Sequence, residues 1–119
     1  MDNCKVLEVT KLLGKKWTPV LLQEINLNGN KGFNLILNRM SKISPKILSK
    51  RLKELESNQL IIKKMSSSAS IKRVSYQLTE KGHELYSILS SIKDWKTKYN
   101  PDEGDCSAKE CVTCKNYTN

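Results

Sequence analysis

Apolar side chains recur at helical spacing through residues 43–60, and this stretch organises the rest of the chain. Leu48, Leu52 and Leu55 fall within one arc of about 60° at 100° per residue. Ser44 is placed to cap a helix, and Pro45 stands at the first helical position, where its missing N–H costs nothing. The pattern predicts a helix over about residues 45–58 with one apolar face.

Three further amphipathic segments precede this helix. Their apolar positions span residues 6–13, 20–27 and 33–40, and glycine-containing breaks separate them. A short turn at residues 41–43 joins the third segment to the 45–58 helix. Two helices joined by a tight turn form a helix-turn-helix, whose second helix enters the major groove of DNA.

After this helix the pattern alternates, as in strands. Residues 60–65 and 71–78 are expected to be the two strands of a hairpin, and the serine-rich residues 66–70 are expected to form its projecting loop. The alternation places three apolar side chains on the core face of the second strand: Val74, Tyr76 and Leu78. A hairpin directly after a helix-turn-helix is typical of a winged helix.

Thr79 is placed to cap a last long helix. The fold class is therefore mainly α with a small β-hairpin (α+β), a winged helix-turn-helix. At 119 residues the chain is one domain. We expect residues 1–100 to form the DNA-binding domain with its dimerisation helices, and residues 101–119 to form a polar, cysteine-containing C-terminal tail.

Positive charge is concentrated in one part of the chain. The net charge is +9, and residues 42–73 hold nine Lys or Arg against two Glu. Lys46, Lys50 and Lys53 fall almost opposite the leucine face of the 45–58 helix. A solvated surface helix would also carry such lysines. The hairpin, however, adds basic residues on both sides of its loop, which favours a polyanionic partner.

The basic residues predict a double-stranded DNA interface with two parts. The 45–58 helix is the recognition helix in the major groove, and the wing at about 63–73 lies on the DNA backbone or in the minor groove. We expect Lys46, Ser49 and Lys50 to reach base edges, while the remaining basic residues meet phosphates and Ser44 helps backbone N–H groups to hold one. The predicted DNA-binding residues are Ser44, Lys46, Ser49, Lys50, Arg51, Lys53, Lys63, Lys64, Lys72 and Arg73.

The first and last helices carry more apolar side chains than a core of this size needs. Packing within one chain would account for some of them. We favour a homodimer, because small domains gain from shared cores and two-fold symmetry suits a DNA reader. The predicted interface residues are Val6, Leu7, Leu85, Leu89, Ile92 and Trp95.

Taken together, the order and spacing of these elements resemble those of HxlR-type winged-helix transcriptional regulators, a group related to the MarR regulators. The matching elements are Cys4, Gly14–Trp17, Phe33–Leu35, Ile43–Leu60 and Tyr76–Gly82. The resemblance implies homodimers on pseudo-palindromic operators. It also makes Cys4 a sensor candidate, because the early cysteine senses oxidants or electrophiles in some members.

The chain departs from the family pattern at three places. An extra lysine stands in Gly14–Trp17, Asn58-Gln59 replaces a glycine often found before the first wing strand, and Ile71-Lys72 replaces a proline pair. These changes bear on the contacts of the wing and leave the fold unchanged.

The four cysteines leave several states open. Cys106, Cys111 and Cys114 lie in the tail, and Cys4 lies near the N-terminus. They are compatible with plain thiols, with a disulfide or thiol switch, and with a zinc or iron–sulfur site. We predict no cofactor and no metal, and the sequence does not identify a small-molecule effector.

Other classes of function find less support. The sole histidine, His83, has no partner for a His-pair metal site or a nucleophile–base pair, so no enzyme is predicted. No apolar run approaches 18 residues and the N-terminus is polar, so we expect a cytoplasmic protein without a membrane role. The alternative is a winged helix that binds RNA or protein. It is disfavoured, because modules for single-stranded RNA stack bases on aromatic residues and the basic window has only Tyr76 at its edge.

Overall fold

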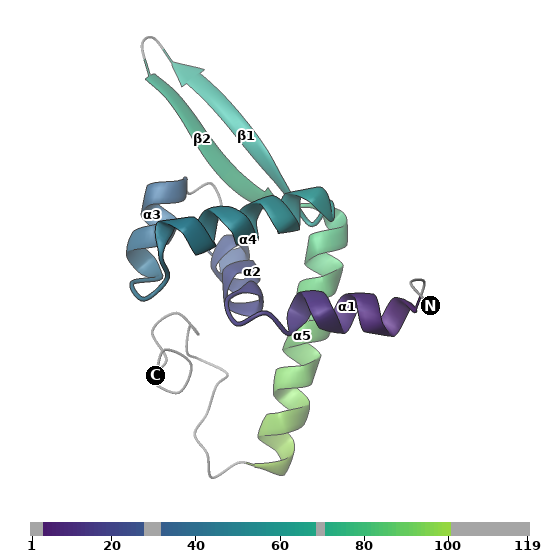
Figure 1. The fold of residues 1–119 in the computed structure, drawn as a ribbon. Coiled ribbons are helices and arrows are strands. Elements are labelled where there is room, and N and C mark those ends of the chain that lie inside the picture. Colours follow the sequence, from purple (N-terminus) through teal and green to yellow (C-terminus); the bar gives the residue numbers. More distant parts are fainter. Residues whose placement is uncertain (1–3, 28–31, 69–70, 101–119) are drawn as a thin grey trace.

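The computed structural model describes residues 4–27, 32–68 and 71–100. In these ranges five helices surround one core, and a two-stranded antiparallel hairpin projects from them (Figure 1). In chain order the elements are α1 (Lys5–Leu13), α2 (Thr18–Leu27), α3 (Phe33–Arg39), α4 (Pro45–Ser57), β1 (Ile61–Ser68), β2 (Ile71–Leu78) and α5 (Glu80–Tyr99). The mainly helical winged helix-turn-helix predicted from the sequence is confirmed.

Two predicted helix caps are present. The Ser44 hydroxyl accepts a hydrogen bond from the Ile47 N–H at 3.1 Å, and Pro45 opens α4. The Thr79 hydroxyl likewise accepts from the Gly82 N–H at 3.0 Å and caps α5. Each cap satisfies a backbone donor that the first turn of a helix leaves unpaired. The start of α4, which carries the candidate DNA-reading residues, is therefore defined by its own side chains.

The core lies around α2 and the apolar face of α4. Leu48, Leu52 and Leu55 are buried as predicted, beside Leu21 and Leu22 of α2. Helix α2 also packs against α5 and β2, and α4 packs against β1. Since the leucine face of α4 is used in this way, its opposite face is left for solvent or a partner.

The hairpin is longer than predicted. The strands continue to Ser68 and resume at Ile71, and Ser66 pairs with Arg73 while Ser67 pairs with Lys72. The expected five-residue loop at 66–70 was therefore wrong. A ladder is held by backbone groups, so serines can extend it where no core side chain is required. This extended hairpin forms the wing, which rises from the end of α4 beyond the helices (Figure 1).

The length of the wing also changes the surroundings of Val74. Tyr76 and Leu78 are buried, as the alternation predicts, but Val74 is exposed. All three lie on one face of the hairpin, since side chains alternate along a strand. The core ends below Val74, so this face of the hairpin continues into solvent. Alternation identified the correct face of the strand but could not show how far the core extends.

Helix α4 ends in a Schellman motif. The Gln59 N–H donates to the Glu56 carbonyl at 3.0 Å, and the Leu60 N–H donates to the Leu55 carbonyl at 2.9 Å. The motif requires a left-handed residue, and Gln59 has a φ of 61°. Gln59 thus occupies a position that glycine fills at lower cost, because only glycine avoids a Cβ clash there.

Replacing Gln59 with glycine should stabilise the protein. Relief of the left-handed strain exceeds the extra entropy of glycine in the unfolded chain, and we expect a gain of about 0.5–1 kcal/mol. Urea denaturation of the native protein, Gln59→Gly and Gln59→Ala measures it. The alanine variant keeps the Cβ and should show no gain. Equal stabilisation by both variants would mean that the backbone conformation is not the cause.

The start of α5 is docked on the turn between α4 and β1. The Thr79 N–H donates to the Leu60 carbonyl at 3.0 Å, and the Thr79 hydroxyl donates to the Gln59 carbonyl at 2.7 Å. The Lys81 Nζ donates to the Asn58 carbonyl at 2.9 Å. These bonds give a structural reason for the Leu-Thr-Glu-Lys-Gly run: it joins α5 to the end of the helix-turn-helix.

Candidate nucleic-acid interface

The outer face of α4 is cationic. Lys46, Lys50 and Lys53 are exposed, on the side opposite the buried leucines. Ser49 is half-buried beside them, and Ser44 is exposed at the start of the helix, where its hydroxyl is used for the cap. Lys46, Lys50 and Lys53 therefore form one exposed row along α4, with the proposed base-reading positions in the N-terminal half of the helix.

The wing presents cations on both of its faces. Lys63 lies opposite Tyr76 in the ladder, and Lys64 lies opposite Ser75. Directly opposed residues share a face and successive residues alternate, so Lys63 and Lys64 lie on different faces, with Arg73 on the face of Lys64. Lys63, Lys64 and Arg73 are exposed, and the backbone of Lys72 pairs with Ser67. A hairpin with cations on both faces suits a groove, where phosphates lie on both sides.

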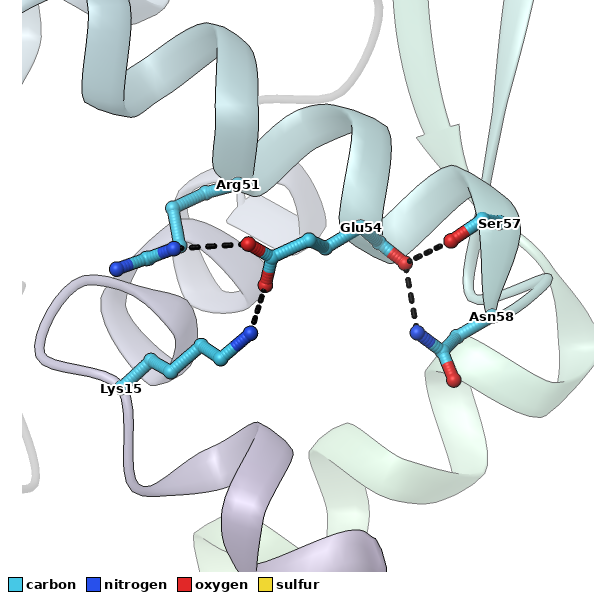
Figure 2. A network of polar contacts seen from close by, with 5 residues as sticks. All are labelled: Lys15, Arg51, Glu54, Ser57 and Asn58. Atoms are coloured by element: carbon cyan, nitrogen blue, oxygen red, sulfur yellow. Dashed lines mark hydrogen bonds and ion pairs between the residues drawn. The ribbon is translucent and has the colours of Figure 1, made fainter.

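Arg51 differs from the other predicted DNA-binding residues. Its Nη1 donates to the Glu54 Oε1 at 2.9 Å, and its side chain is only 15% exposed. Glu54 is bound from its other side by the Nζ of Lys15, which stands between α1 and α2 (Figure 2). This arrangement favours a structural role for Arg51 within α4 over a contact with DNA.

The Lys15–Glu54 pair was missed by reasoning from the sequence. The spacing of Arg51 and Glu54 by three residues is a visible signal for a pair on a helix. Lys15, however, is 39 residues away from Glu54, and no periodicity connects them. The sole hint was the position of Lys15 as an additional lysine in an otherwise familiar element.

The charges around Glu54 control its protonation. Partial burial raises the pKa of this carboxyl, but the hydrogen bond and positive charge of Lys15, and then those of Arg51, outweigh burial. The pKa of Glu54 therefore lies below its ordinary value of 4.5. Glu54 stays anionic at neutral pH and keeps both cations in place.

Ionised Glu54 should stabilise the protein at pH values above the ordinary pKa of a glutamate. A lowered pKa stabilises the native state above the unfolded pKa, and this contribution is lost as the pH falls through the lower native pKa. We expect Glu54→Gln to cost about 1 kcal/mol at neutral pH, since solvent screens the half-exposed Lys15. Below about pH 4.5 the difference should shrink. Urea denaturation at neutral and acidic pH measures it, and a difference independent of pH would contradict the assignment.

The predicted dimer residues divide into two groups. Val6, Leu7, Ile92 and Trp95 are exposed, with Trp95 at 63%. Leu85 and Leu89 are partly buried and pack against the core of their own chain. The exposed group is therefore the part of the predicted interface that remains available to a partner.

The structure describes one of the four cysteines. Cys4 is an exposed free thiol at the N-cap of α1, whereas Cys106, Cys111 and Cys114 lie outside the described residues. Within residues 4–27, 32–68 and 71–100, no group of three His, Cys, Asp or Glu side chains is placed to hold a metal ion. In the same part of the chain, no helix combines the length and apolar character needed to cross a membrane.

Comparison with known protein families identifies the kind of protein that carries this surface. Residues 12–104 match the model of the HxlR-like helix-turn-helix family, which is most of the chain. The chain belongs to the HxlR-like helix-turn-helix family. It is thus a transcriptional regulator of the helix-turn-helix type and not an enzyme.

Individual relatives agree with this assignment. The HTH-type transcriptional regulator YodB of Bacillus subtilis is 33% identical over 99 residues, which is 83% of this chain and 86% of YodB. Its solved reduced form matches with a TM-score of 0.72 and covers 86% of this chain and 98% of that chain.

Two further solved structures share the fold. The redox regulator HypR in its reduced form is 27% identical, with a TM-score of 0.70, over 83% of this chain and 95% of that chain. A transcriptional regulator of the MarR family from Porphyromonas gingivalis W83 is also 27% identical, with a TM-score of 0.69, over 82% of this chain and 93% of that chain. The family is thus structurally similar to MarR regulators.

Proposed function

We propose that this protein acts as a homodimer that recognises specific sequences of double-stranded DNA in the cytoplasm. Helix α4 is the recognition helix in the major groove, and the wing contacts the backbone or the minor groove. The observation that carries this proposal is the row of exposed lysines on α4, opposite its buried leucines and followed directly by a cationic wing. One amphipathic helix thereby joins the core and presents charge to a polyanion.

The proposed contacts divide by chemistry. Lys46, Ser49 and Lys50, in the N-terminal half of α4, reach base edges, where lysine donates to guanine O6 or N7. The other predicted basic residues, apart from Arg51, meet phosphates: Lys53, Lys63, Lys64, Lys72 and Arg73. Ser44 holds the first turn of α4, so that its backbone N–H groups face a phosphate. Arg51 is assigned to Glu54 and supports the helix.

The dimer is proposed from the exposed apolar side chains of α1 and α5. On α5, Ile88, Ile92, Trp95 and Tyr99 are each more than half exposed. Their spacing places them in one stripe along the helix. Val6 and Leu7 add exposed apolar surface on α1. A second copy of the chain would remove this surface from water and bring two α4 helices to two half-sites.

Binding to genomic DNA fragments, including the region upstream of the gene itself, tests the proposal. We expect a bound fragment with dimer stoichiometry and an affinity that falls steeply with salt, because each phosphate contact releases counterions. A scrambled duplex of the same composition is the control. Equal binding to both duplexes would contradict sequence-specific recognition. Tighter binding to single-stranded RNA would favour the RNA alternative.

Cys4 is proposed as a redox- or electrophile-responsive thiol. It is exposed at the start of α1, and α1 carries part of the proposed dimer surface. The related HypR is described as a redox regulator. Modification at this position can therefore change the packing of α1 and the spacing of the two recognition helices.

The response should depend on Cys4 alone if this thiol is the sensor. We expect an oxidant or a quinone to change the DNA affinity of the native protein by about tenfold and to leave Cys4→Ser unchanged. A variant that lacks Cys106, Cys111 and Cys114 and keeps Cys4 serves as the control, and it should respond like the native protein. A response that persists in Cys4→Ser would assign sensing to the tail cysteines.

A further inference from the structure

We propose that Lys15 is a positioning residue for DNA recognition, which acts through Glu54 of α4 without contacting DNA. The inference rests on the proposed function of α4 as the recognition helix. It concerns the extra lysine of the Gly14–Trp17 element, to which the proposed DNA contacts give no role. The link joins α4 to the connection between α1 and α2, and so to the helix that begins after Cys4.

The position of Lys15 is fixed by hydrogen bonds of its backbone groups. Its N–H donates to the Leu12 carbonyl at 3.4 Å, and its carbonyl accepts from the Thr18 N–H at 3.1 Å. The turn is anchored by Trp17 and Thr18, which are both buried. The ammonium group therefore extends from a fixed backbone position, and its contact with Glu54 relates α4 to that position.

The Glu54 carboxylate is paired with two cationic side chains, which have different structural roles. Arg51 belongs to α4 itself, so its contact with Glu54 cannot fix the helix relative to the rest of the protein. Lys15 comes from another element, and its contact does. The Glu54 carbonyl, in addition, accepts from the Asn58 Nδ2 at 2.8 Å and from the Ser57 Oγ at 3.0 Å (Figure 2). The backbone carbonyl of Glu54 thus binds the end of its own helix, while its carboxylate links α4 to the connection between α1 and α2.

A displacement at Glu54 is passed along the helix. Lys50 lies four residues before Glu54, one helical turn away on the same rigid element. Hydrogen bonds to base edges weaken beyond about 3.2 Å, so a small tilt of α4 costs affinity without removing any DNA contact. The salt dependence of binding should then stay unchanged, because that slope counts phosphate contacts.

A double-mutant cycle on DNA affinity tests this role. The variants are Lys15→Ala, Glu54→Gln and the pair together, measured on a selected operator at several salt concentrations. We expect each single change to weaken binding by about fivefold and the pair to be no worse than either, with an unchanged salt slope. Lys15→Arg should restore affinity, because it keeps the ion pair.

The matched control is Lys16→Ala. Lys16 is the exposed neighbour of Lys15, with its ammonium 5.1 Å from the centre of the Trp17 ring. The Lys16→Ala substitution removes one positive charge from the same turn as Lys15→Ala does. We expect it to weaken DNA binding less than Lys15→Ala, and by the same factor whether residue 54 is Glu or Gln. Stoichiometric titration counts the active fraction, so misfolded protein does not enter the affinities.

The outcomes separate the two proposals. Additive losses from Lys15→Ala and Glu54→Gln, a salt slope lowered by about one in Lys15→Ala, or no loss in Lys15→Ala would overturn the positioning role. An equal loss in Lys16→Ala would overturn it too, since net charge would then suffice. Absence of specific binding by the native protein would instead overturn the proposed function, on which this role depends.

Discussion

Gly82→Ala should destabilise the protein by about 3 kcal/mol or more, which is a large share of the stability of a small domain. A Cβ at this position would overlap the Leu60 carbonyl oxygen and lie 3.1 Å from the Leu60 carbonyl carbon. That oxygen belongs to the backbone and accepts the Thr79 N–H, so it cannot move without breaking a bond. The start of α5 would have to separate from the turn between α4 and β1.

Urea denaturation measures this cost, with Ser87→Ala as the matched control. Ser87 is an exposed residue of the same helix, so its change should stay within about 0.5 kcal/mol. The destabilised variant should also lose DNA affinity, because the turn holds the end of α4. A Gly82→Ala protein as stable as the Ser87→Ala control would mean that α5 does not approach Leu60 so closely.

Lys50→Ala should weaken operator binding by about tenfold or more and relax preference at one base pair. Lys50 is exposed in the middle of the cationic face of α4, with Leu48 and Leu52 buried on the other side. Its removal leaves the core unchanged, so the loss should appear in binding and not in stability. Competition between matched operators and operators with single mismatches measures the change in preference.

Lys53→Ala is the control that separates the two kinds of contact. Lys53 lies on the same exposed face but nearer the end of α4, where we assign it to a phosphate. Its loss should weaken all duplexes about equally and lower the salt slope by about one. If Lys53→Ala relaxed base preference and Lys50→Ala did not, the assignment of base and backbone contacts would have to be reversed.

Local signals in the sequence predicted the parts of the fold that depend on local chemistry. The Ser44 and Thr79 caps and the leucine face of α4 follow from rules that involve residues a few positions apart. The extent of the wing did not follow, because serines 66–68 pair through backbone groups that every residue has. Val74 shows the same limit, since alternation does not report where the core stops.

Contacts between segments far apart in the chain could not be predicted from the sequence. The approach of Gly82 to Leu60 and the pair of Lys15 with Glu54 depend on how α1, α4 and α5 meet. The left-handed backbone of Gln59 was not predicted either, because the loss of a glycine at Asn58-Gln59 was interpreted only for its effect on the wing. These three features determine how α4 is positioned in the protein, whereas the exposed lysines are the side chains that α4 offers to a partner. Only the exposed side chains can be predicted from the sequence of one helix considered alone.

The proposal that α4 reads the major groove as part of a dimer is tested most directly by methylation interference on a selected operator. Methylation at guanine N7 blocks contacts in the major groove. We predict two symmetric clusters of interference, about 10 base pairs or a small multiple of that apart, one for each α4. Lys50→Ala should lose interference at one position in each cluster. A single cluster, or specific binding unaffected by major-groove methylation, would contradict the proposal.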